Sequence, residues 1–421
     1  MNFNYMRNKR KNKVQWKTSI ELFYNKLKYL YIISFVLFAC CACAKNKENI
    51  SEPENEPIVE YVEKSYVDVI VEEPFIEPEV DLLMVGDILL HDNVQNSGKL
   101  SDGTYNYDHL FENVITDIQA ADLAIANQEV ILGGTDLGLS GYPAFNGPFE
   151  VGDALVNAGF DVILHATNHT LDRGKKALLN CLDFWETNHP EVAVLGAFDS
   201  QEDYDNSIYV YEEDGLKIAI LNYTYGTNGI PSPSDMPFAV ARLEEEKVIS
   251  DLQKAEMLAD FTVVCPHWGT EYQHKQSDEQ EKWAALFMEY GADLVIGTHP
   301  HYIQPVEMLT DEAGKQMLVY YSLGNFINST NENGRGTADR MVGAMAQVTI
   351  AKNESGEAYI KDYGVEPLVT QLLYGIQEIT TYKLSDYTEE LASQNEISKK
   401  DSVFNLTFCQ ELCEDVFGDL Y

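Results

Sequence analysis

Short apolar runs alternate with amphipathic stretches through most of this chain, and this alternation restricts the fold more than any other feature. The amphipathic stretches are residues 148–157, 175–187, 244–258 and 277–290. The apolar runs are residues 82–85, 123–126, 162–164, 218–221, 262–264, 294–296 and 318–321. Continuous apolar strands separated by helices indicate sheets that are covered by helices on their outer faces. We therefore predict one α/β domain over residues 81–371, with an edge strand at 356–369.

The remaining segments differ from this domain in composition. Residues 1–28 hold eight Lys and Arg and one acid, and an apolar run follows to residue 44. That run is short for a membrane span but suits an export signal, so we read residues 1–44 as an export signal or membrane anchor. Residues 45–80 form an acidic, proline-containing linker, and residues 372–421 an acidic C-terminal tail. We expect an extracytoplasmic protein that is tethered to the bacterial cell membrane.

The way the anchor is attached depends on one cysteine. The residues Leu37-Phe38-Ala39-Cys40 resemble a bacterial lipoprotein cleavage box. In that reading Cys40 is the lipidated residue, and an uncleaved single anchor is the alternative. The four cysteines outside this segment match no zinc-binding spacing, and we expect them to be buried free thiols.

The charge balance excludes one class of partner. The chain has 68 Asp and Glu against 29 Lys and Arg, a formal net charge of −39. A field of that sign repels nucleic acid, and the sequence has no basic stripe that would override it. We expect no nucleic-acid partner.

Polar residues follow six of the predicted strands at the point where each ends. Ligands bind beyond the carboxyl ends of the strands in α/β sheets, so these side chains should converge on one edge. They are Asp87, His91, Asn127, Glu129, Asn168, His169, Asp172, His267, His299, His301 and Asn325. Asp, Asn and neutral His are ligands that suit Mn, Fe or Zn.

The number of candidate ligands is too large for one ion. The seven that we consider first are Asp87, His91, Asn127, Asn168, His267, His299 and His301. They predict two divalent metal ions about 3.5–4 Å apart with a bridging carboxylate, for which Asp87 is the natural choice. His169 then suits a proton donor that Asp172 orients. Glu271 could hold a ligand histidine or act on the substrate, and His165 reads as a core histidine.

Six ordered motifs carry a family resemblance. They are GDILLH (86–91), ANQE (126–129), ATNHTLDRG (166–174), HWGTEY (267–272), GTHPHYIQ (297–304) and YSLGNF (321–326). Over about residues 81–369 the chain resembles the CapA-type family of bacterial poly-γ-glutamate capsule proteins, which is similar to the calcineurin-like metallophosphatases. The resemblance implies a four-layer α/β/β/α metallophosphatase-like sandwich with a two-metal site.

The resemblance also implies roles for individual residues. It supports Asp87, Asn168, His267, His299 and His301 as metal ligands, together with His91 and Asn127 or Glu129, and His169 as the proton donor. One departure concerns the first motif, since metallophosphatases usually begin with Asp-x-His and here the histidine follows Asp87 by four residues.

These features predict a surface-tethered, dinuclear metal-dependent hydrolase that acts in the synthesis, release or trimming of a poly-γ-glutamate capsule. The bond attacked would be a γ-glutamyl amide or a phosphoester. The expected partners are an anionic polymer or phosphoester substrate, the membrane through the N-terminal anchor, and a possible membrane synthase complex. The alternatives are a phosphatase or phosphodiesterase for small exported esters, and a non-catalytic polymer-binding partner of the synthase.

Overall fold

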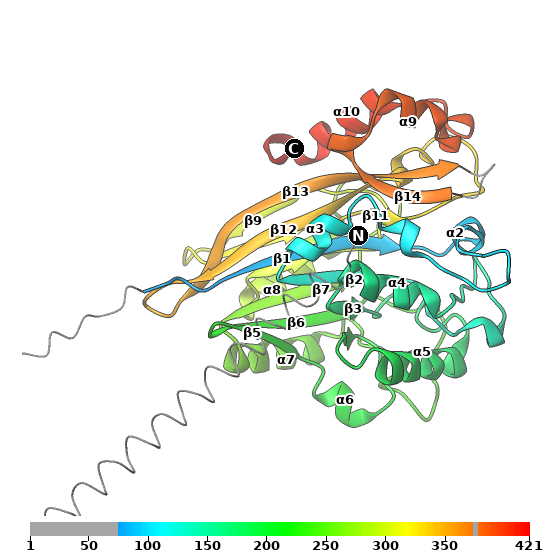
Figure 1. Ribbon diagram of the computed structural model, residues 1–421. Helices are drawn as coiled ribbons and strands as arrows, with labels where there is room; N and C mark the ends of the chain where they lie inside the picture. Colours follow the sequence, from blue (N-terminus) through cyan, green and yellow to red (C-terminus); the bar gives the residue numbers. More distant parts are fainter. Residues whose placement is uncertain (1–74, 374–377) are drawn as a thin grey trace, which may run out of the picture. The chain divides into compact units, whose positions relative to one another are not determined.

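Two sheets lie at the centre of the fold (Figure 1). The first has eight strands. Seven follow the order β14-β13-β12-β1-β2-β3-β4, and β11 pairs with β1 at Asp87 and Ile88. Its strands are β1 (Glu79–Ile88), β2 (Leu123–Asn127), β3 (Val162–Leu164), β4 (Ala193–Leu195), β11 (Asn325–Ile327), β12 (Val342–Lys352), β13 (Ala358–Leu373) and β14 (Glu378–Lys383). β1 to β4 run parallel, whereas β12 to β14 are antiparallel. The half of this sheet formed by β1 to β4 is therefore the part whose strand ends meet at one edge.

The second sheet has six strands in the order β5-β6-β7-β8-β10-β9. Its strands are β5 (Tyr209–Glu213), β6 (Leu216–Thr224), β7 (Phe261–His267), β8 (Leu294–Ile296), β9 (Val306–Thr310) and β10 (Gln316–Tyr320). The neighbours β6, β7, β8 and β10 are parallel to one another. Their carboxyl ends therefore also share one edge.

The computed structural model describes residues 75–373 and 378–421. The predicted anchor, with Cys40, and nearly all of the predicted linker lie outside these residues. In the two described ranges, none of the helices has the length and apolar character that a membrane span needs.

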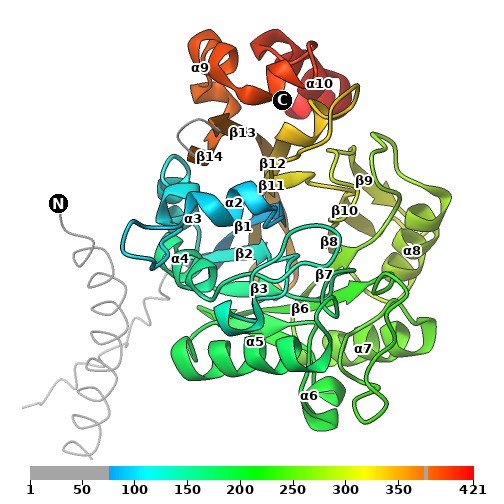
Figure 2. The ribbon, with the colours of Figure 1, turned by 90° about the vertical axis from the view of Figure 1, so that its right-hand side faces the viewer.

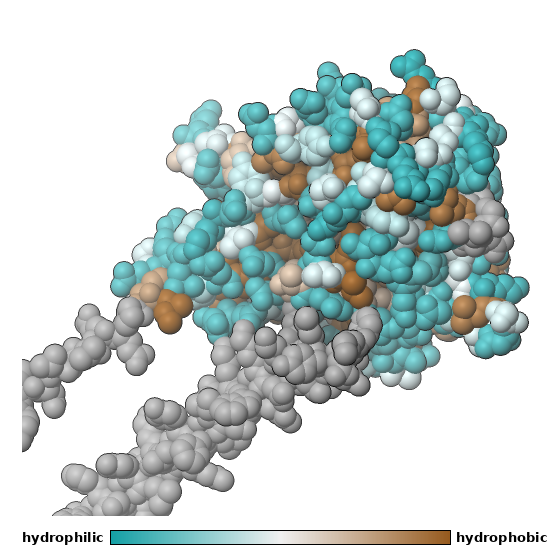
Figure 3. Space-filling model, turned by 45° about the horizontal axis from the view of Figure 1, so that its top comes forward, coloured by the Kyte–Doolittle hydropathy of each residue, from teal (hydrophilic) through white to brown (hydrophobic). Residues whose placement is uncertain are grey.

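Helices accompany the outer sides of the two sheets. Figure 2 shows α3, α4 and α5 beside β1 to β3, and α7 and α8 beside β6 to β8. The helices are α2 (Asp92–Ser97), α3 (Ile115–Ala120), α4 (Glu150–Ala158), α5 (Gly174–Asn188), α6 (Gln201–Asp205), α7 (Glu245–Leu258), α8 (Asp278–Glu289), α9 (Glu389–Gln394) and α10 (Leu406–Phe417). A capping box between Ser277 and Gln280 begins α8. The face of the molecule in Figure 3 is mostly hydrophilic, with apolar residues in small scattered groups.

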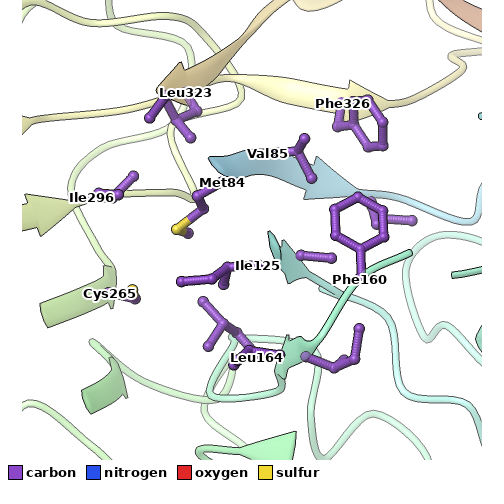
Figure 4. Packing of buried hydrophobic residues seen from close by; sticks show 14 of the residues in the cluster. Met84, Val85, Ile125, Phe160, Leu164, Cys265, Ile296, Leu323 and Phe326 are labelled. Atoms are coloured by element: carbon purple, nitrogen blue, oxygen red, sulfur yellow. The ribbon is translucent and has the colours of Figure 1, made fainter. Parts of the chain in front are cut away.

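Apolar side chains from both sheets fill the space between them. Met84, Ile125 and Leu164 come from β1, β2 and β3, and they point toward Cys265 and Ile296 of β7 and β8 (Figure 4). All five are buried. Removing this apolar surface from water holds the two sheets face to face and so fixes the position of their carboxyl edges.

The predicted pattern is confirmed in its main features. The seven apolar runs lie in β1, β2, β3, β6, β7, β8 and β10, apart from Tyr321, and the amphipathic stretches become α4, α5, α7 and α8 with ends shifted by at most two residues. The result is the predicted α/β sandwich with two sheets. Cys181, Cys265, Cys409 and Cys413 are buried free thiols, as expected.

One strand prediction was wrong in its placement. The strand predicted at 356–369 forms β13, but β13 is not at the edge of its sheet, because β14 pairs with it antiparallel. β14 lies within residues 372–421, which we read as an acidic tail. Its six residues EITTYK have too few apolar side chains to show the strand pattern, and their pairing depends on the long partner strand.

Gly86 provides a test of how tightly β1 is packed at the edge of the site. A Cβ atom at this position would lie 2.0 Å from the carbonyl oxygen of Gly324, a distance that real contacts do not reach. We expect Gly86→Ala to lower the free energy of unfolding by about 3 kcal/mol or more, since backbone must move. Gly364→Ala in β13 is the control, because its Cβ would meet no atom within 4 Å. Urea unfolding measures both, and equal losses would contradict the packing.

Candidate metal centre

The predicted ligands meet at the carboxyl edge of the two sheets. Asp87 lies near the end of β1 and pairs in register with Asn127 of β2 and Asn325 of β11. His267 is the last residue of β7, and the loops after β2, β3 and β8 supply the rest. The buried members are Asp87, Asn127, Glu129, Asn168, His169, His267, His299 and His301. The structure therefore brings together residues that are up to 214 positions apart.

Asp87 contacts residues from both sheets. Its Oδ1 accepts a hydrogen bond from Nδ2 of Asn127 at 2.7 Å. Its Oδ2 accepts one from the backbone N–H of His299 at 3.1 Å and lies 3.1 Å from Nδ1 of His301. Nδ1 of His267 is 3.8 Å from Oδ1. This carboxylate thus links β1 to the end of β7 and to the loop after β8.

The carboxylate of Glu129 lies among three imidazoles and makes no hydrogen bond to the described residues. Its Oε1 is 3.8 Å from Nε2 of His267, 3.8 Å from Nε2 of His301 and 3.9 Å from Nε2 of His169. Burial, and then the negative charge of Asp87, raise the pKa of Glu129 well above its usual value. Ligand atoms of Glu129, His299 and His301 all lie within 4.8 Å of one another. A carboxylate buried in this position stays ionised only beside a positive charge, and otherwise takes up a proton.

Buried polar atoms of the site lack hydrogen-bond partners among the described residues. Oδ1 of Asn127, both carboxylate oxygens of Glu129 and Nδ1 of His299 are buried and make no hydrogen bond to described residues. Buried polar atoms without partners are costly unless a ligand satisfies them. Burial, and then the neighbouring histidines, lower the pKa of His267 and His299 well below the usual value, which favours the neutral imidazole that binds metals. These donors fit divalent ions such as Mn, Fe or Zn.

The loop of residues 297–301 has a strained backbone. His299 and His301 have φ of 99° and 57°, on either side of Pro300. Positive φ is unfavourable for residues with a side chain and persists where the surroundings determine it. The carbonyl of Pro300 accepts a hydrogen bond from the backbone N–H of Tyr272 at 2.8 Å, and Asp87 holds the N–H of His299. In this conformation Nδ1 of His301 lies 3.1 Å from Oδ2 of Asp87, and ligand atoms of both histidines lie within 4.8 Å of one of Glu129.

Asn168 and His267 contact each other across the two sheets. Nε2 of His267 lies 2.9 Å from Oδ1 of Asn168, and its Nδ1 lies 3.1 Å from the hydroxyl of Thr298. We expected Glu271 to hold a histidine or to act on substrate. Thr298 contacts His267, and Glu271 is exposed, so both roles predicted for Glu271 stay predictions. Sequence reasoning missed Thr298, although it directly precedes His299.

His169 and Asp172 form a hydrogen-bonded pair. Nδ1 of His169 lies 2.6 Å from Oδ2 of Asp172, and the same oxygen accepts a hydrogen bond from the backbone N–H of Phe145 at 2.8 Å. The ring of Phe145 packs edge-on against His169, with ring centroids 4.7 Å apart. Nδ2 of Asn228 lies 3.4 Å from Nδ1 of His169. These contacts hold the imidazole with Nε2 toward Glu129. No pattern in the sequence pointed to Phe145 or Asn228.

His91 follows Asp87 by four residues, and its role as a metal ligand stays a prediction. It is half-buried, and its ring packs edge-on against Phe145 at 5.2 Å. Burial, and then the charges of His301 and Arg340, lower the pKa of His91 to about 3. His165, by contrast, is a core histidine as predicted, because its Nε2 accepts a hydrogen bond from Nε1 of Trp185 at 3.0 Å.

Comparison with known families agrees with this geometry. The model of the family described as bacterial capsule synthesis protein PGA_cap matches residues 81–330. The chain belongs to that family. The match contains all of the buried donors and ends before Arg340 and the C-terminal helices.

Two curated relatives carry capsule names. The capsule biosynthesis protein CapA of Bacillus anthracis is 28% identical over 264 residues, which cover 59% of this chain and 60% of the relative. The PGA biosynthesis protein CapA of Bacillus subtilis is 30% identical over 204 residues, which cover 48% and 50%. The chain therefore spans between half and three fifths of the length of these relatives.

Solved structures with partial similarity include hydrolases. A novel phosphatase of Mycoplasma pneumoniae has a TM-score of 0.42 at 15% identity, covering 70% of this chain and 95% of that one. The NAD nucleotidase of Haemophilus influenzae has a TM-score of 0.45 at 12% identity, covering 82% and 65%.

Proposed function

We propose that this protein is an extracytoplasmic, membrane-tethered metal-dependent hydrolase that cleaves γ-linked polyglutamate during synthesis, release or trimming of a capsule. The observation that carries the proposal is the unpaired Glu129 carboxylate, 3.8–3.9 Å from Nε2 of three histidines. Membership of the capsule synthesis family supports the polymer as substrate. The basic, apolar N-terminal segment supports the tether.

Two sets of residues divide the work of the proposed site. The metal-holding set comprises Asp87, Asn127, Glu129, Asn168, His267, His299 and His301. Metal bound by these residues would supply an activated water molecule and an electrophile for the bond that is attacked. Asp87 and Glu129 would supply the negative charge of this set, and each contacts residues of both sheets.

His169 supplies the proton chemistry. Asp172 accepts the Nδ1–H of this ring, which fixes the tautomer and leaves Nε2 facing the centre. Nε2 can then hold a proton for the leaving amine of a γ-glutamyl bond. Phe145 covers one side of the ring and keeps it in this orientation.

Metal loading followed by assays of two substrate classes tests the proposal. The full chain is purified in detergent, stripped with a chelator and reloaded with Mn, Fe or Zn. We expect cleavage of γ-linked polyglutamate that is lost on stripping and restored on reloading. Phosphate release from p-nitrophenyl phosphate without polymer cleavage would instead show a phosphatase. Polymer binding without any turnover would show a non-catalytic partner of a synthase. Both outcomes would contradict the proposal.

A further inference from the structure

Arg340 lies beside the metal centre and is tied to it through Asn325. It belongs to a short 3₁₀ turn, Asp339–Met341, that precedes β12. Nδ2 of Asn325 donates hydrogen bonds to the carbonyl of Arg340 at 3.0 Å and to the carbonyl of His301 at 3.2 Å. Oδ1 of the same side chain lies 3.1 Å from Nδ1 of His301. One asparagine therefore fixes the backbone of Arg340 relative to a metal-holding histidine.

The guanidinium of Arg340 is held by an aromatic ring at the rim. Its Cζ lies 4.1 Å from the ring centre of Tyr272, and that ring is 5.9 Å from the ring of His301. Stacking on an aromatic face leaves the edge of a guanidinium free for a planar anion. The Nε atom is buried and makes no hydrogen bond to any described residue. The guanidinium of Arg340 thus lies near the metal centre, and one of its N–H groups has no hydrogen-bond acceptor among the described residues.

A carboxylate of the protein already occupies part of that edge. Nη2 of Arg340 donates to Oε2 of Glu332 at 2.7 Å. The side chain of Glu332 is 64% exposed, whereas that of Arg340 is 15% exposed. Because Glu332 faces solvent and is hydrated when released, another carboxylate can replace it on Arg340 while the guanidinium stays paired.

The loop that carries Glu332 is fastened on both sides. Oδ2 of Asp401 accepts a hydrogen bond from the backbone N–H of Gly336 at 2.9 Å, and the carbonyl of Lys400 accepts one from Gly334 at 3.1 Å. On the other side, Nδ2 of Asn93 donates to Oδ1 of Asn331 at 3.2 Å. Asp401 and Lys400 belong to the C-terminal segment beyond the family match. That segment therefore holds the Glu332 loop in place over the arginine.

We infer that Arg340 binds the α-carboxylate of a γ-linked glutamate residue in the substrate, and that Glu332 occupies this position until the substrate displaces it. The inference rests on the proposed function for its substrate. A glutamate side chain as the resident partner favours a carboxylate over a phosphate. The contact also offsets electrostatic repulsion. A chain of net charge −39 repels a polyanionic substrate, and a cation beside the site attracts that substrate locally. Arg173 and Arg242 are less suited, since both donate to neighbouring loop atoms.

Equilibrium binding of a fluorescein-labelled γ-linked glutamate oligomer to the full chain tests this role without requiring turnover. Arg340→Gln should weaken binding about 10-fold or more, the effect of losing a charge-assisted hydrogen bond. Glu332→Gln should tighten binding severalfold, and only while Arg340 is present. Arg335→Gln is the matched control, because it removes the same charge from an exposed position of the same loop. It should change the dissociation constant less than about 2-fold.

Three outcomes would overturn the inference. The first is equal weakening by Arg340→Gln and Arg335→Gln. The second is tightening by Glu332→Gln that persists in the Arg340→Gln background, which would show a general charge effect. The third is stronger competition by inorganic phosphate than by free glutamate, which would identify a phosphate site. Circular dichroism of each variant confirms that it is folded. Arg340-dependent binding without polymer cleavage would contradict the proposed hydrolysis and leave the arginine's role intact.

Discussion

Replacement of His169 by alanine should lower the turnover number for polymer cleavage by about 10²- to 10⁴-fold, the contribution usual for a general acid. The reason is geometric: Asp172 engages Nδ1, and Nε2 faces Glu129 at 3.9 Å. The bound metal should stay unchanged, since the other donors remain. Steady-state kinetics and metal analysis of the same preparation measure both quantities.

Asp172→Asn is the companion variant for this prediction. It keeps the shape of the side chain and can still accept from Phe145, but it no longer stabilises a protonated His169. We expect a smaller loss of turnover and a shift in the pH profile, with metal content again unchanged. Loss of metal in His169→Ala would identify this histidine as a ligand and contradict the proton-donor role.

Replacement of Glu129 by glutamine should have opposite effects on stability and function. Glutamine keeps the size of the side chain but cannot carry the charge that a cation needs. We expect the metal-dependent rise in the unfolding midpoint to disappear, together with activity. The metal-free variant should be more stable than the metal-free wild type by about 1 kcal/mol or more, because an unpartnered buried carboxylate is lost.

The stability gain should depend on pH in a defined direction. The pKa of Glu129 is raised in the folded state above its ordinary value of 4.5. Between the ordinary pKa and the raised pKa of the folded state, the folded protein binds more protons at Glu129 than the unfolded chain does. The free energy of unfolding therefore falls as the pH rises through this range. The advantage of Glu129→Gln should therefore grow as the pH rises above about 4.5.

Glu271→Gln is the control for Glu129→Gln. It removes one acid from the same region at an exposed position. We expect little change in metal affinity or metal-free stability. Chemical unfolding at several pH values, with and without metal, gives all of these quantities. An unaltered metal-dependent stabilisation in Glu129→Gln would show that this carboxylate is not a ligand.

The residues at the carboxyl ends of the strands could be predicted from the sequence with little ambiguity. Strand–helix alternation predicts parallel pairing, and parallel strands necessarily bring their carboxyl ends to one edge. His267 and His299 therefore lie at one edge for a reason that is visible in the local pattern. Asp87 belongs to the other sheet and meets them because the two sheets pack face to face. The chemistry of Asp, Asn and His then points to metals without reference to any coordinates.

The contacts between loops could not be predicted from the sequence in this way. Phe145, Asn228 and Thr298 reach the site from turns whose course depends on the packing beneath them. Glu332 meets Arg340 from a loop that the C-terminal segment and Asn93 hold in place. β14 is likewise a strand because β13 offers it a partner. The sequence by itself determined which residue types stand at the strand ends, since periodicity is local. Only the tertiary structure decided which of them face one another, because loop positions depend on contacts between residues distant in the chain.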